Sequence, residues 1–196
     1  IITIEDPIEY HVEGIEQTQV DEEAGYSFAN GLKSIMRQDP DAILVGEIRD
    51  RDTAEIGIQA ALTGHLVFST VHANEAAGAI PRLLDLNVKD SSIGPAVNLI
   101  MAQRLVRRLC DKFKKEKEIT DEIRAKIDHL PKILMPESIK IFQAVGCPEC
   151  NDLGYRGRVG IFELLKVGAE IEELIKKHAS ETEIQKFAVT NGMVTM

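Results

Sequence analysis

The feature that most constrains the fold is a short apolar run between two acidic turns, in residues 39–50 (DPDAILVGEIRD). Residues 42–45 are wholly apolar and partly β-branched, and they end at Gly46. Such a run predicts a strand that is buried on both faces of a parallel sheet. Glu47 follows the strand's C-terminal end, where open α/β sheets bind ligands. This stretch alone is equally typical of a ligand site and of an ordinary solvated charged turn.

Predicted strands and helices alternate in the first half of the chain. Residues 1–4 predict a buried strand that ends at Glu5 and Asp6, and residues 65–71 predict another that ends at His72. The other elements expected there are an edge strand or hairpin in residues 12–20 and helices that begin at Ser27, at Asp52 and at Asn74. This alternation is typical of parallel strands with right-handed crossovers. We therefore expect Glu5, Asp6, Glu47 and His72 along one edge of one sheet.

The second half of the chain predicts one long helix, an insert and a return to the main body. Residues 92–109 predict the helix, with an apolar middle and a basic end that suits a helix C-terminus. Residues 111–136 are rich in lysine and glutamate, with one short helix after Thr120 marked by Ile123, Ile127 and Leu130. Residues 161–165 predict a returning strand, followed by two helices, the last with a capping box at Ser180 and Glu183 and a stop at Gly192.

Composition excludes several classes of function. The 196 residues carry a net charge of −9 with a pI near 5.1, which argues against nucleic acid as the main ligand. No apolar run approaches the roughly 18 residues of a membrane span. Three cysteines, two of them in Cys147-Pro148-Glu149-Cys150, favour a metal clip over a disulfide framework. The chain opens directly in a strand and stops just after a helix, so we expect a fragment of a longer polypeptide.

Five strings resemble, in order and spacing, the secretion and pilus-assembly ATPases of the GspE/PilB family. They are ITIEDPIEY (2–10), RQDPDAILVGEIRD (37–50), TGHLVFSTVHAN (63–74), AQRLVRRLC (102–110) and GYRGRVGIFELL (154–165). The resemblance implies an α/β fold with a RecA-like P-loop NTPase core, which uses ATP and Mg²⁺. It also implies a cytoplasmic homo-hexamer that lies at the inner membrane through a platform protein and drives pilus extension or type II secretion.

The resemblance also implies roles for individual residues. Glu47 would orient water or hold Mg²⁺ through it, Glu5 would be the general base, and His72 would sense the γ-phosphate. Asp6, Glu9, Arg49 and His65 would lie on the nucleotide-binding side, although a structural role is the stronger expectation for His65. Gly46 stands where other NTPases carry the Walker B aspartate.

The sequence departs from the family pattern in two places. The P-loop string G-x-x-x-x-G-K-[ST] does not occur in it, so we expect ATP hydrolysis in the parent protein and not in this chain alone. The family's first Cys-x-x-Cys pair is reduced to Cys110, with Phe113 at the partner position. Cys110, Cys147 and Cys150 could still hold zinc, with Asp111, His129 or water as the fourth ligand. The alternative is that residues 147–150 form an empty turn.

Three parts are expected: a partial ATPase core (1–109), a cysteine-containing insert (110–153) and a return strand with C-terminal helices (154–196). The insert favours an assembly or secretion ATPase over a pilus-retraction ATPase, which lacks it. A second hypothesis is a catalytically silent scaffold that contacts partners through the lysine-rich insert. A DNA-translocating relative is disfavoured by the acidic charge.

Overall fold

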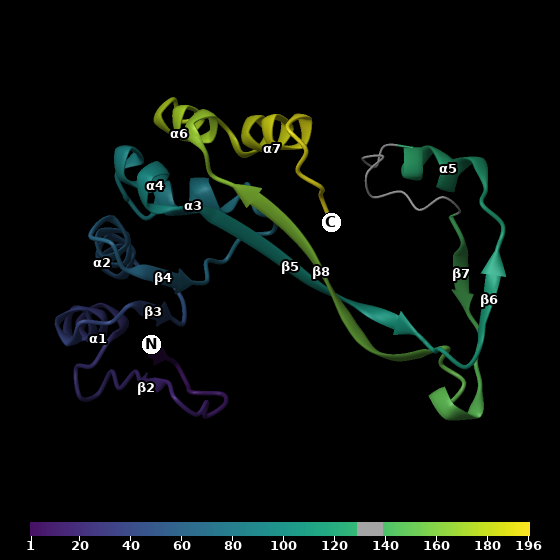
Figure 1. The fold of residues 1–196 in the computed structure, drawn as a ribbon, viewed down its shortest axis with the longest axis horizontal. Coiled ribbons are helices and arrows are strands. Elements are labelled where there is room, and N and C mark those ends of the chain that lie inside the picture. The colour runs from purple at the N-terminus through teal and green to yellow at the C-terminus, as the bar shows by residue number, and fades with distance from the viewer. Residues whose placement is uncertain (129–138) are drawn as a thin grey trace. The chain divides into compact units, whose positions relative to one another are not determined.

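The computed structural model describes residues 1–128 and 139–196, which form two compact units (Figure 1). The first unit comprises residues 1–100 and 165–187, and the second comprises residues 101–164 and 188–196. The predicted cysteine-containing insert, residues 110–153, lies within the second unit. The predicted three-part division at residues 109 and 153 is a different partition and stays a prediction.

A four-stranded parallel sheet forms the centre of the first unit. Its strands are β1 (Ile2–Glu5), β2 (Glu16–Gln19), β3 (Ala42–Val45) and β4 (Leu66–Ser69), in the order β2-β1-β3-β4. Each neighbouring pair runs parallel, in a register that aligns Ile4 with Val45 and Val45 with Ser69. The prediction of parallel strands is confirmed. The hairpin alternative for residues 12–20 is wrong, because β2 pairs in parallel with β1 at the edge of the sheet.

Helices of the first unit follow the strands along the chain. They are α1 (Phe28–Ile35), the 3₁₀ helix η1 (Met36–Gln38), α2 (Arg51–Leu62), α3 (Ala79–Asp85), α4 (Asp90–Ala96), α6 (Ala169–Lys176) and most of α7 (Glu181–Thr190). The predicted cap Ser27 is confirmed, since its hydroxyl accepts a hydrogen bond from the Asn30 amide at 3.3 Å. None of the helices in the described part of the chain is long and apolar enough to cross a membrane.

Two predicted helix starts are wrong. The N-cap of α2 is Asp50, not Asp52, because Asp50 Oδ1 accepts the Thr53 amide at 2.8 Å and Asp52 already lies in the first turn. The helix predicted to start at Asn74 begins at Ala79, with Gly78 at its N-cap position. Hydrogen bonds from each amide to the carbonyl three residues earlier form tight turns over residues 75–80 and delay the helix.

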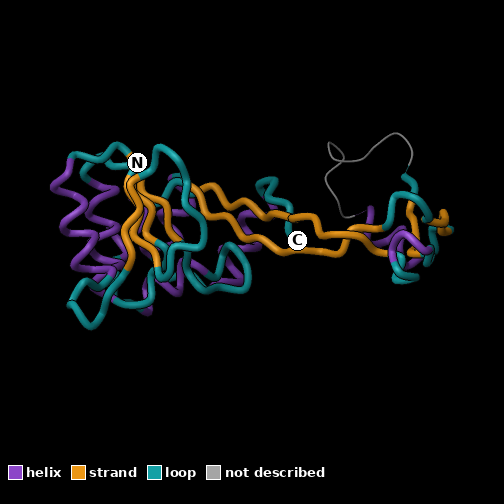
Figure 2. The backbone as a smooth tube through the Cα atoms, turned by 90° about the horizontal axis from the view of Figure 1, so that it is seen from below, coloured by secondary structure: helices purple, strands orange, loops and turns teal. Residues whose placement is uncertain are grey.

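The core of the first unit lies between the sheet and α1 and α2. Ile4, Ile43 and Val45 are almost completely buried, and they pack with Leu32 and Ile35 of α1. Figure 2 shows helices gathered along one side of these strands. Because side chains alternate along a strand, the neighbours of these residues point to the opposite face of the sheet.

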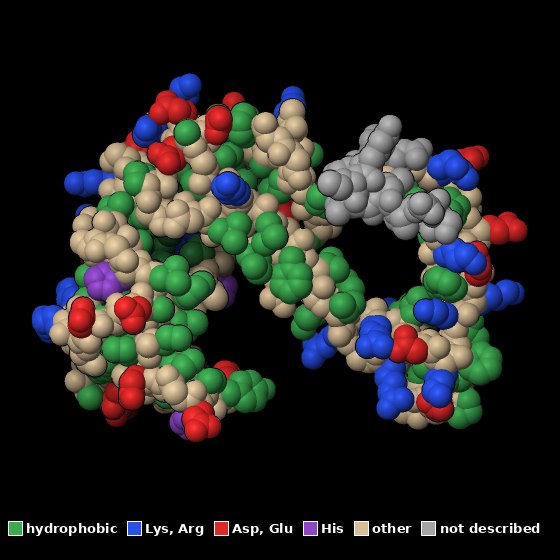
Figure 3. Space-filling view, in the orientation of Figure 1, with side chains coloured by type: hydrophobic (Ala, Val, Ile, Leu, Met, Phe, Trp, Pro, Cys, Tyr) green, Lys and Arg blue, Asp and Glu red, His purple; other side chains and the backbone are tan. Residues whose placement is uncertain are grey.

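The opposite face of the sheet is open over β4. Leu66 and Phe68 are each 54% exposed, and the register places Phe68 beside Leu44. Figure 3 shows hydrophobic side chains over this part of the unit. The prediction that residues 65–71 form a buried strand is therefore wrong in its burial, although the strand itself is present. The reason is position, since β4 is one of the two edge strands and no other strand of the described residues pairs with its free side.

The predicted helix over residues 92–109 is wrong. The helix α4 contains Pro95 and ends at Ala96, and residues 99–109 form the strand β5 (Leu99–Leu109), which pairs with β8 (Tyr155–Lys166). Backbone hydrogen bonds mark the two ends of this pair, from the Cys110 amide to the Gly154 carbonyl and from the Val167 amide to the Asn98 carbonyl, each at 3.0 Å. Residues 99–109 form a strand and not a helix because β8, which is remote in sequence, forms hydrogen bonds with their backbone amides and carbonyls.

The second unit holds a small antiparallel sheet beside the cysteines. Its strands are β6 (Lys114–Lys117) and β7 (Ile141–Ala144), with α5 (Asp121–Asp128) between them in sequence and the 3₁₀ turn η3 (Pro148–Cys150) after them. The short helix after Thr120 is confirmed, and Leu130 lies outside the described residues.

Two further predictions near the C-terminus are confirmed. The strand predicted over residues 161–165 is present as part of the longer β8. The capping box of α7 is present, because the Glu183 amide donates to Ser180 Oγ at 3.3 Å and the Ser180 amide donates to Glu183 Oε2 at 2.8 Å.

Candidate functional site

The carboxyl-terminal edge of the parallel sheet carries most of the candidate residues. β1 ends at Glu5, Glu47 follows β3, and His72 follows β4. Hydrogen bonds hold the segments after the strands together, since the Ile48 amide donates to the Thr70 carbonyl at 2.9 Å and Thr70 Oγ1 donates to the Gly46 carbonyl at 2.8 Å. The expected meeting of the strand ends at one edge is therefore present in the structure.

Glu47 is the centre of a cluster of charged side chains at this edge. Its Oε2 atom lies 2.6 Å from Arg49 Nε and 3.1 Å from His72 Nε2. Arg49 also lies near Asp6, with 3.7 Å between its Nη1 atom and Asp6 Oδ2. The Glu47 side chain is only 16% exposed, whereas the side chains of Arg49 and His72 are mostly exposed. The structure thus brings Asp6, Glu47, Arg49 and His72 together.

The cluster favours the ionised form of Glu47. The hydrogen bond from Arg49 lowers the pKa of the Glu47 carboxyl below its ordinary value, and the contact with His72 acts in the same direction, while burial opposes both. The same contact with Glu47 raises the pKa of the Arg49 guanidinium. A carboxylate at a strand end that stays charged is suited to hold a divalent cation or a water molecule.

Glu5 is held in place by side chains of β1 and β2 and not by this cluster. Its Oε1 atom accepts hydrogen bonds from Thr3 Oγ1 at 2.6 Å and from Gln17 Nε2 at 2.9 Å. Gln17 also donates to the Tyr10 carbonyl at 3.0 Å, so it ties the loop after β1 to β2. Gln17 was not predicted as a site residue, although its amide side chain lies in residues 12–20, which were expected to form an edge strand or hairpin.

Among the described residues, neither Glu9 nor His65 makes a hydrogen bond or an ion pair with this cluster. Glu9 is exposed in the loop after β1. His65 immediately precedes β4 and so lies at the opposite, amino-terminal end of that strand. Its Nδ1 atom is 3.1 Å from the Ala60 carbonyl and 3.2 Å from Thr63 Oγ1. These contacts join the end of α2 to the start of β4, and the structural role expected for His65 stays a prediction.

Close packing of two strands explains the glycine next to Glu47. The Gly46 amide donates to the Ile4 carbonyl at 2.8 Å. A Cβ atom at Gly46 would lie 3.2 Å from the Ile4 carbonyl oxygen and 3.4 Å from both Glu5 Cα and Phe28 Cε1. A side chain at this position would therefore push against the backbone that carries Glu5.

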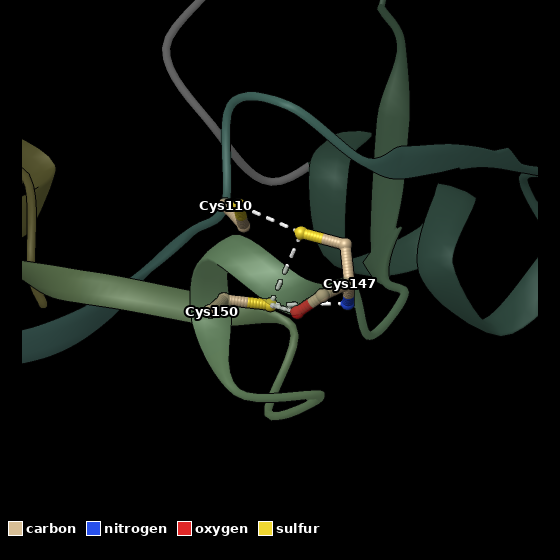
Figure 4. A group of neighbouring side chains, drawn as sticks. All are labelled: Cys110, Cys147 and Cys150. Carbon is tan, nitrogen blue, oxygen red and sulfur yellow. Dashed lines mark hydrogen bonds between the residues drawn. The ribbon is translucent and has the colours of Figure 1, made fainter.

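The three cysteines form a second candidate site, in the second unit (Figure 4). All are buried, and the Sγ atom of Cys147 lies 3.5 Å from that of Cys150 and 3.8 Å from that of Cys110. Burial raises the pKa of the Cys147 thiol. At Cys150 burial also acts to raise the pKa, but hydrogen bonds from the amides of Cys147 and Gly154 outweigh it, so the pKa of this thiol lies below its ordinary value.

The sulfur atoms fit three corners of a zinc tetrahedron. Zinc–sulfur bonds of about 2.3 Å place the sulfurs of a tetrahedral site about 3.8 Å apart. All three sulfurs lie within 4.8 Å of one another, and no other Cys, His, Asp or Glu of the described residues joins the group. Of the fourth ligands considered, Asp111 forms an ion pair with Arg108, and His129 lies outside the described residues. The cysteines could therefore hold a metal ion.

Comparison with known proteins identifies the family. The family model described as "Type II/IV secretion system protein" matches residues 1–196. The chain belongs to this family. The expected relationship to the GspE/PilB ATPases is thereby confirmed.

Curated relatives of this family resemble the chain over nearly its whole length. The type II secretion system ATPase E of Vibrio cholerae is 48% identical over 186 residues, which cover 95% of this chain and 36% of the relative. The type IV pilus assembly ATPase PilB of Myxococcus xanthus is 46% identical over 200 residues, which cover 100% of this chain and 34% of the relative. The chain thus spans about a third of the length of these relatives.

Solved structures show the same fold. The pilus retraction motor PilT with bound ADP matches with a TM-score of 0.61 and 27% identity, over 100% of this chain and 50% of that one. The ATPase DotB of Yersinia pseudotuberculosis matches with a TM-score of 0.65 and 23% identity, over 96% of this chain and 41% of that one. The predicted RecA-like α/β fold with a cysteine-containing insert is confirmed.

Proposed function

We propose that this chain is part of a hexameric ATPase that couples ATP hydrolysis to type IV pilus extension or type II secretion. The observation that carries the proposal is the Glu47 cluster, a partly buried carboxyl group at the carboxyl edge of a parallel sheet with Asp6, Arg49 and His72 around it. The curated relatives are named as secretion or pilus-assembly ATPases, which supports the same conclusion.

Glu47 would be the central residue of hydrolysis. Asp6 and Glu47 supply the carboxylate oxygens that Mg²⁺ prefers, and the metal would neutralise charge on the phosphates when bound. In the structure Arg49 contacts both carboxylates, so it must release them before they can serve a cation or a water molecule. We therefore propose that Arg49 turns from Glu47 toward the nucleotide phosphates when the site is filled.

Glu5 and His72 would act on either side of Glu47. Glu5 would accept a proton from the attacking water, and its hydrogen bonds from Thr3 and Gln17 fix the position of the carboxylate. His72 would leave Glu47 Oε2 and donate a hydrogen bond to the γ-phosphate. Asp6 and Glu9 would support these groups as neighbouring acids.

The phosphate cradle would come from a P-loop encoded upstream in the parent protein. The string is absent from the 196 residues, so this chain alone should bind ATP weakly and turn it over at no measurable rate. The open face and free edge of β4 support this proposal. Parallel sheets are normally covered on both faces, and Leu66 and Phe68 are each 54% exposed. A strand and a helix of the parent would cover them.

The parent would work in the cytoplasm at the inner membrane. We propose that six copies form a ring, and that hydrolysis rotates domains against one another and moves an inner-membrane platform protein. Cys110, Cys147 and Cys150 would hold structural zinc, because their sulfur spacing matches that of zinc thiolate sites. A metal at this insert would fix the segments that join β5 to β8.

ATP turnover by matched variants tests the function. The parent, extended upstream through the P-loop, should hydrolyse ATP, and Glu47→Gln in it should abolish turnover while ATP still binds. Glu16→Gln is the matched control, because Glu16 is an exposed acid at the amino-terminal end of β2 and should leave turnover unchanged. Turnover retained in Glu47→Gln would refute the assignment, and an inactive extended protein assembled with its platform partner would favour the silent scaffold.

A further inference from the structure

We infer that Gln17 is a positioning residue that couples the loop after β1 to the Glu5 carboxylate, so that a movement of this loop reorients Glu5. The loop comprises residues 6–12 and follows Glu5, the last residue of β1. The inference rests on the proposed function, in which Glu5 is the general base. The coupling itself is a property of the 196-residue chain, and it can be measured without ATP.

Three hydrogen bonds converge on the side-chain amide of Gln17. Its Nε2 atom donates to Glu5 Oε1 at 2.9 Å and to the Tyr10 carbonyl at 3.0 Å. Its Oε1 atom accepts a hydrogen bond from the Val12 amide at 2.8 Å. A glutamine amide has two N–H donors and one carbonyl acceptor, so both of its polar atoms are engaged at once. Because the loop and the carboxylate share one side chain, a shift of the loop backbone must break a hydrogen bond or move the amide that holds Glu5.

Two side chains donate to Glu5 Oε1, and only one of them is tied to the loop. Thr3 Oγ1 donates at 2.6 Å, and Thr3 is buried within β1. The parallel register pairs Gln17 with Thr3, so both donors come from neighbouring positions on the same face of the sheet. Gln17 is only half-buried, and its side chain reaches beyond the sheet to the loop. The orientation of Glu5 therefore depends on one donor fixed by the sheet and on one donor shared with the loop.

The side chains of the loop face solvent while its backbone is held by Gln17. Tyr10 is 81% exposed and Val12 is 49% exposed, yet the carbonyl of the first and the amide of the second both bond to Gln17. The exposed side chains are accessible to any group that meets this edge of the sheet. A contact that displaces the loop would weaken the hydrogen bond from Gln17 and change the orientation of Glu5. The loop is therefore a point of control over hydrolysis.

Carbon-detected NMR of the full 196-residue chain at neutral pH tests the coupling. The substitution Val12→Pro removes the amide that Gln17 accepts and leaves Glu5 itself unchanged. We expect it to shift the Cδ signal of Glu5, because the Gln17 amide is then free to turn. Val12→Ala keeps the backbone amide and is the matched control, so its Glu5 signal should equal that of the wild type.

Substitution of the amide side chain tests the positioning role. In the 196-residue chain, Gln17→Leu should shift the Glu5 Cδ signal and make the Val12 amide exchange faster. In the parent extended upstream, it should lower kcat about tenfold to a hundredfold with little change in KM for ATP, because Glu5 would act on the attacking water and not on nucleotide binding. Gln19→Leu is the matched control on β2. Gln19 Oε1 accepts the Ile8 amide at 3.2 Å, and within the described residues it makes no hydrogen bond with the Glu5 side chain, so the Glu5 signal and kcat should both stay at their wild-type values.

Three results would overturn the inference. A Glu5 signal that is unshifted in Val12→Pro and in Gln17→Leu would mean that the loop and the carboxylate are not coupled. Equal shifts in Val12→Pro and Val12→Ala would mean that the side chain of Val12, and not its amide, acts on Glu5. A shifted Glu5 signal with wild-type kcat in Gln17→Leu would remove the positioning role.

Two further results are separable from these. If Val12→Pro does not fold, the Glu5 shift and the faster Val12 exchange in Gln17→Leu decide the question. Turnover retained by Glu5→Gln in the extended parent would refute the proposed role of Glu5 in hydrolysis, and the NMR signals of the 196-residue chain would still decide the coupling.

Discussion

Alanine substitutions at two helical glycines should have opposite effects on the stability of this fold. Gly31 lies in α1, where a Cβ atom would be 2.2 Å from Ile4 Cδ1 and 2.9 Å from Tyr26 Cζ. Carbon atoms normally rest about 3.5–4.0 Å apart. Ile4 has no exposed surface and so has little room to move. Gly57 lies in α2, and a Cβ atom there would meet nothing within 4 Å.

The magnitudes follow from two opposing terms. Replacing glycine by alanine within a helix stabilises by about 1 kcal/mol through backbone propensity. Forcing an extra carbon into a packed core typically costs about 1–3 kcal/mol, and the short distance to Ile4 places Gly31→Ala near the upper end. The free energy of unfolding should therefore fall by about 1–2 kcal/mol in Gly31→Ala and rise by about 1 kcal/mol in Gly57→Ala.

Urea unfolding of the full chain, followed by far-ultraviolet circular dichroism, measures both changes. The midpoint should move to lower urea in Gly31→Ala and to higher urea in Gly57→Ala, with an unchanged slope in each. Two variants that shift in the same direction would refute the reasoning, because helix propensity alone predicts equal gains. Because Ile4 immediately precedes Glu5, Gly31→Ala should also disturb the position of Glu5 in the extended parent.

Three further substitutions test contacts of the first unit. Arg49→Ala should raise the pKa of Glu47 toward its ordinary value, as measured by carbon-detected NMR titration. The lowered pKa of Glu47 stabilises the folded chain at pH values above its ordinary pKa of about 4.5, and this contribution is lost as the pH falls through the pKa of the folded state. The difference in stability between the wild type and Arg49→Ala should therefore become smaller in acid. Asp50→Ala should cost about 1 kcal/mol by removing the cap that accepts the Thr53 amide, and a urea midpoint equal to the wild type would contradict this. Ser180→Ala should cost about the same at α7, seen as faster amide exchange in its first turn.

Local signals in the sequence predicted the local structure well. The run Ala42–Val45 is a strand because β-branched residues between turn residues have few other options, and Ser27 and Ser180 start helices because their hydroxyls accept backbone amides. The meeting of the residues that follow β1, β3 and β4 was predictable for a similar reason. Parallel strands joined by crossovers bring their carboxyl ends to one edge, whatever the details of packing.

Predictions that depended on remote partners were the ones that failed. Leu99–Leu109 was predicted as helix, because the apolar stretch before its arginines has no clear period, and the strand β5 is decided by β8, which lies far along the chain. The prediction that β4 is buried failed because an apolar strand at the centre of a sheet and one at its edge can have the same sequence pattern. The contact of Glu5 with Gln17 was likewise hidden, since it depends on β2 running parallel to β1.

The outer edge of β4, which no other strand of the described residues pairs with, has a practical consequence for work with the chain on its own. An edge strand with unpaired amides and carbonyls, and with side chains such as Leu66 and Phe68 turned to solvent, is a template for pairing with another chain. Concentrated preparations of the 196 residues should therefore self-associate through strand addition and precipitate more readily than the longer parent proposed above. A charged substitution such as Phe68→Lys would suppress that association, and would give biophysical experiments a better-behaved sample.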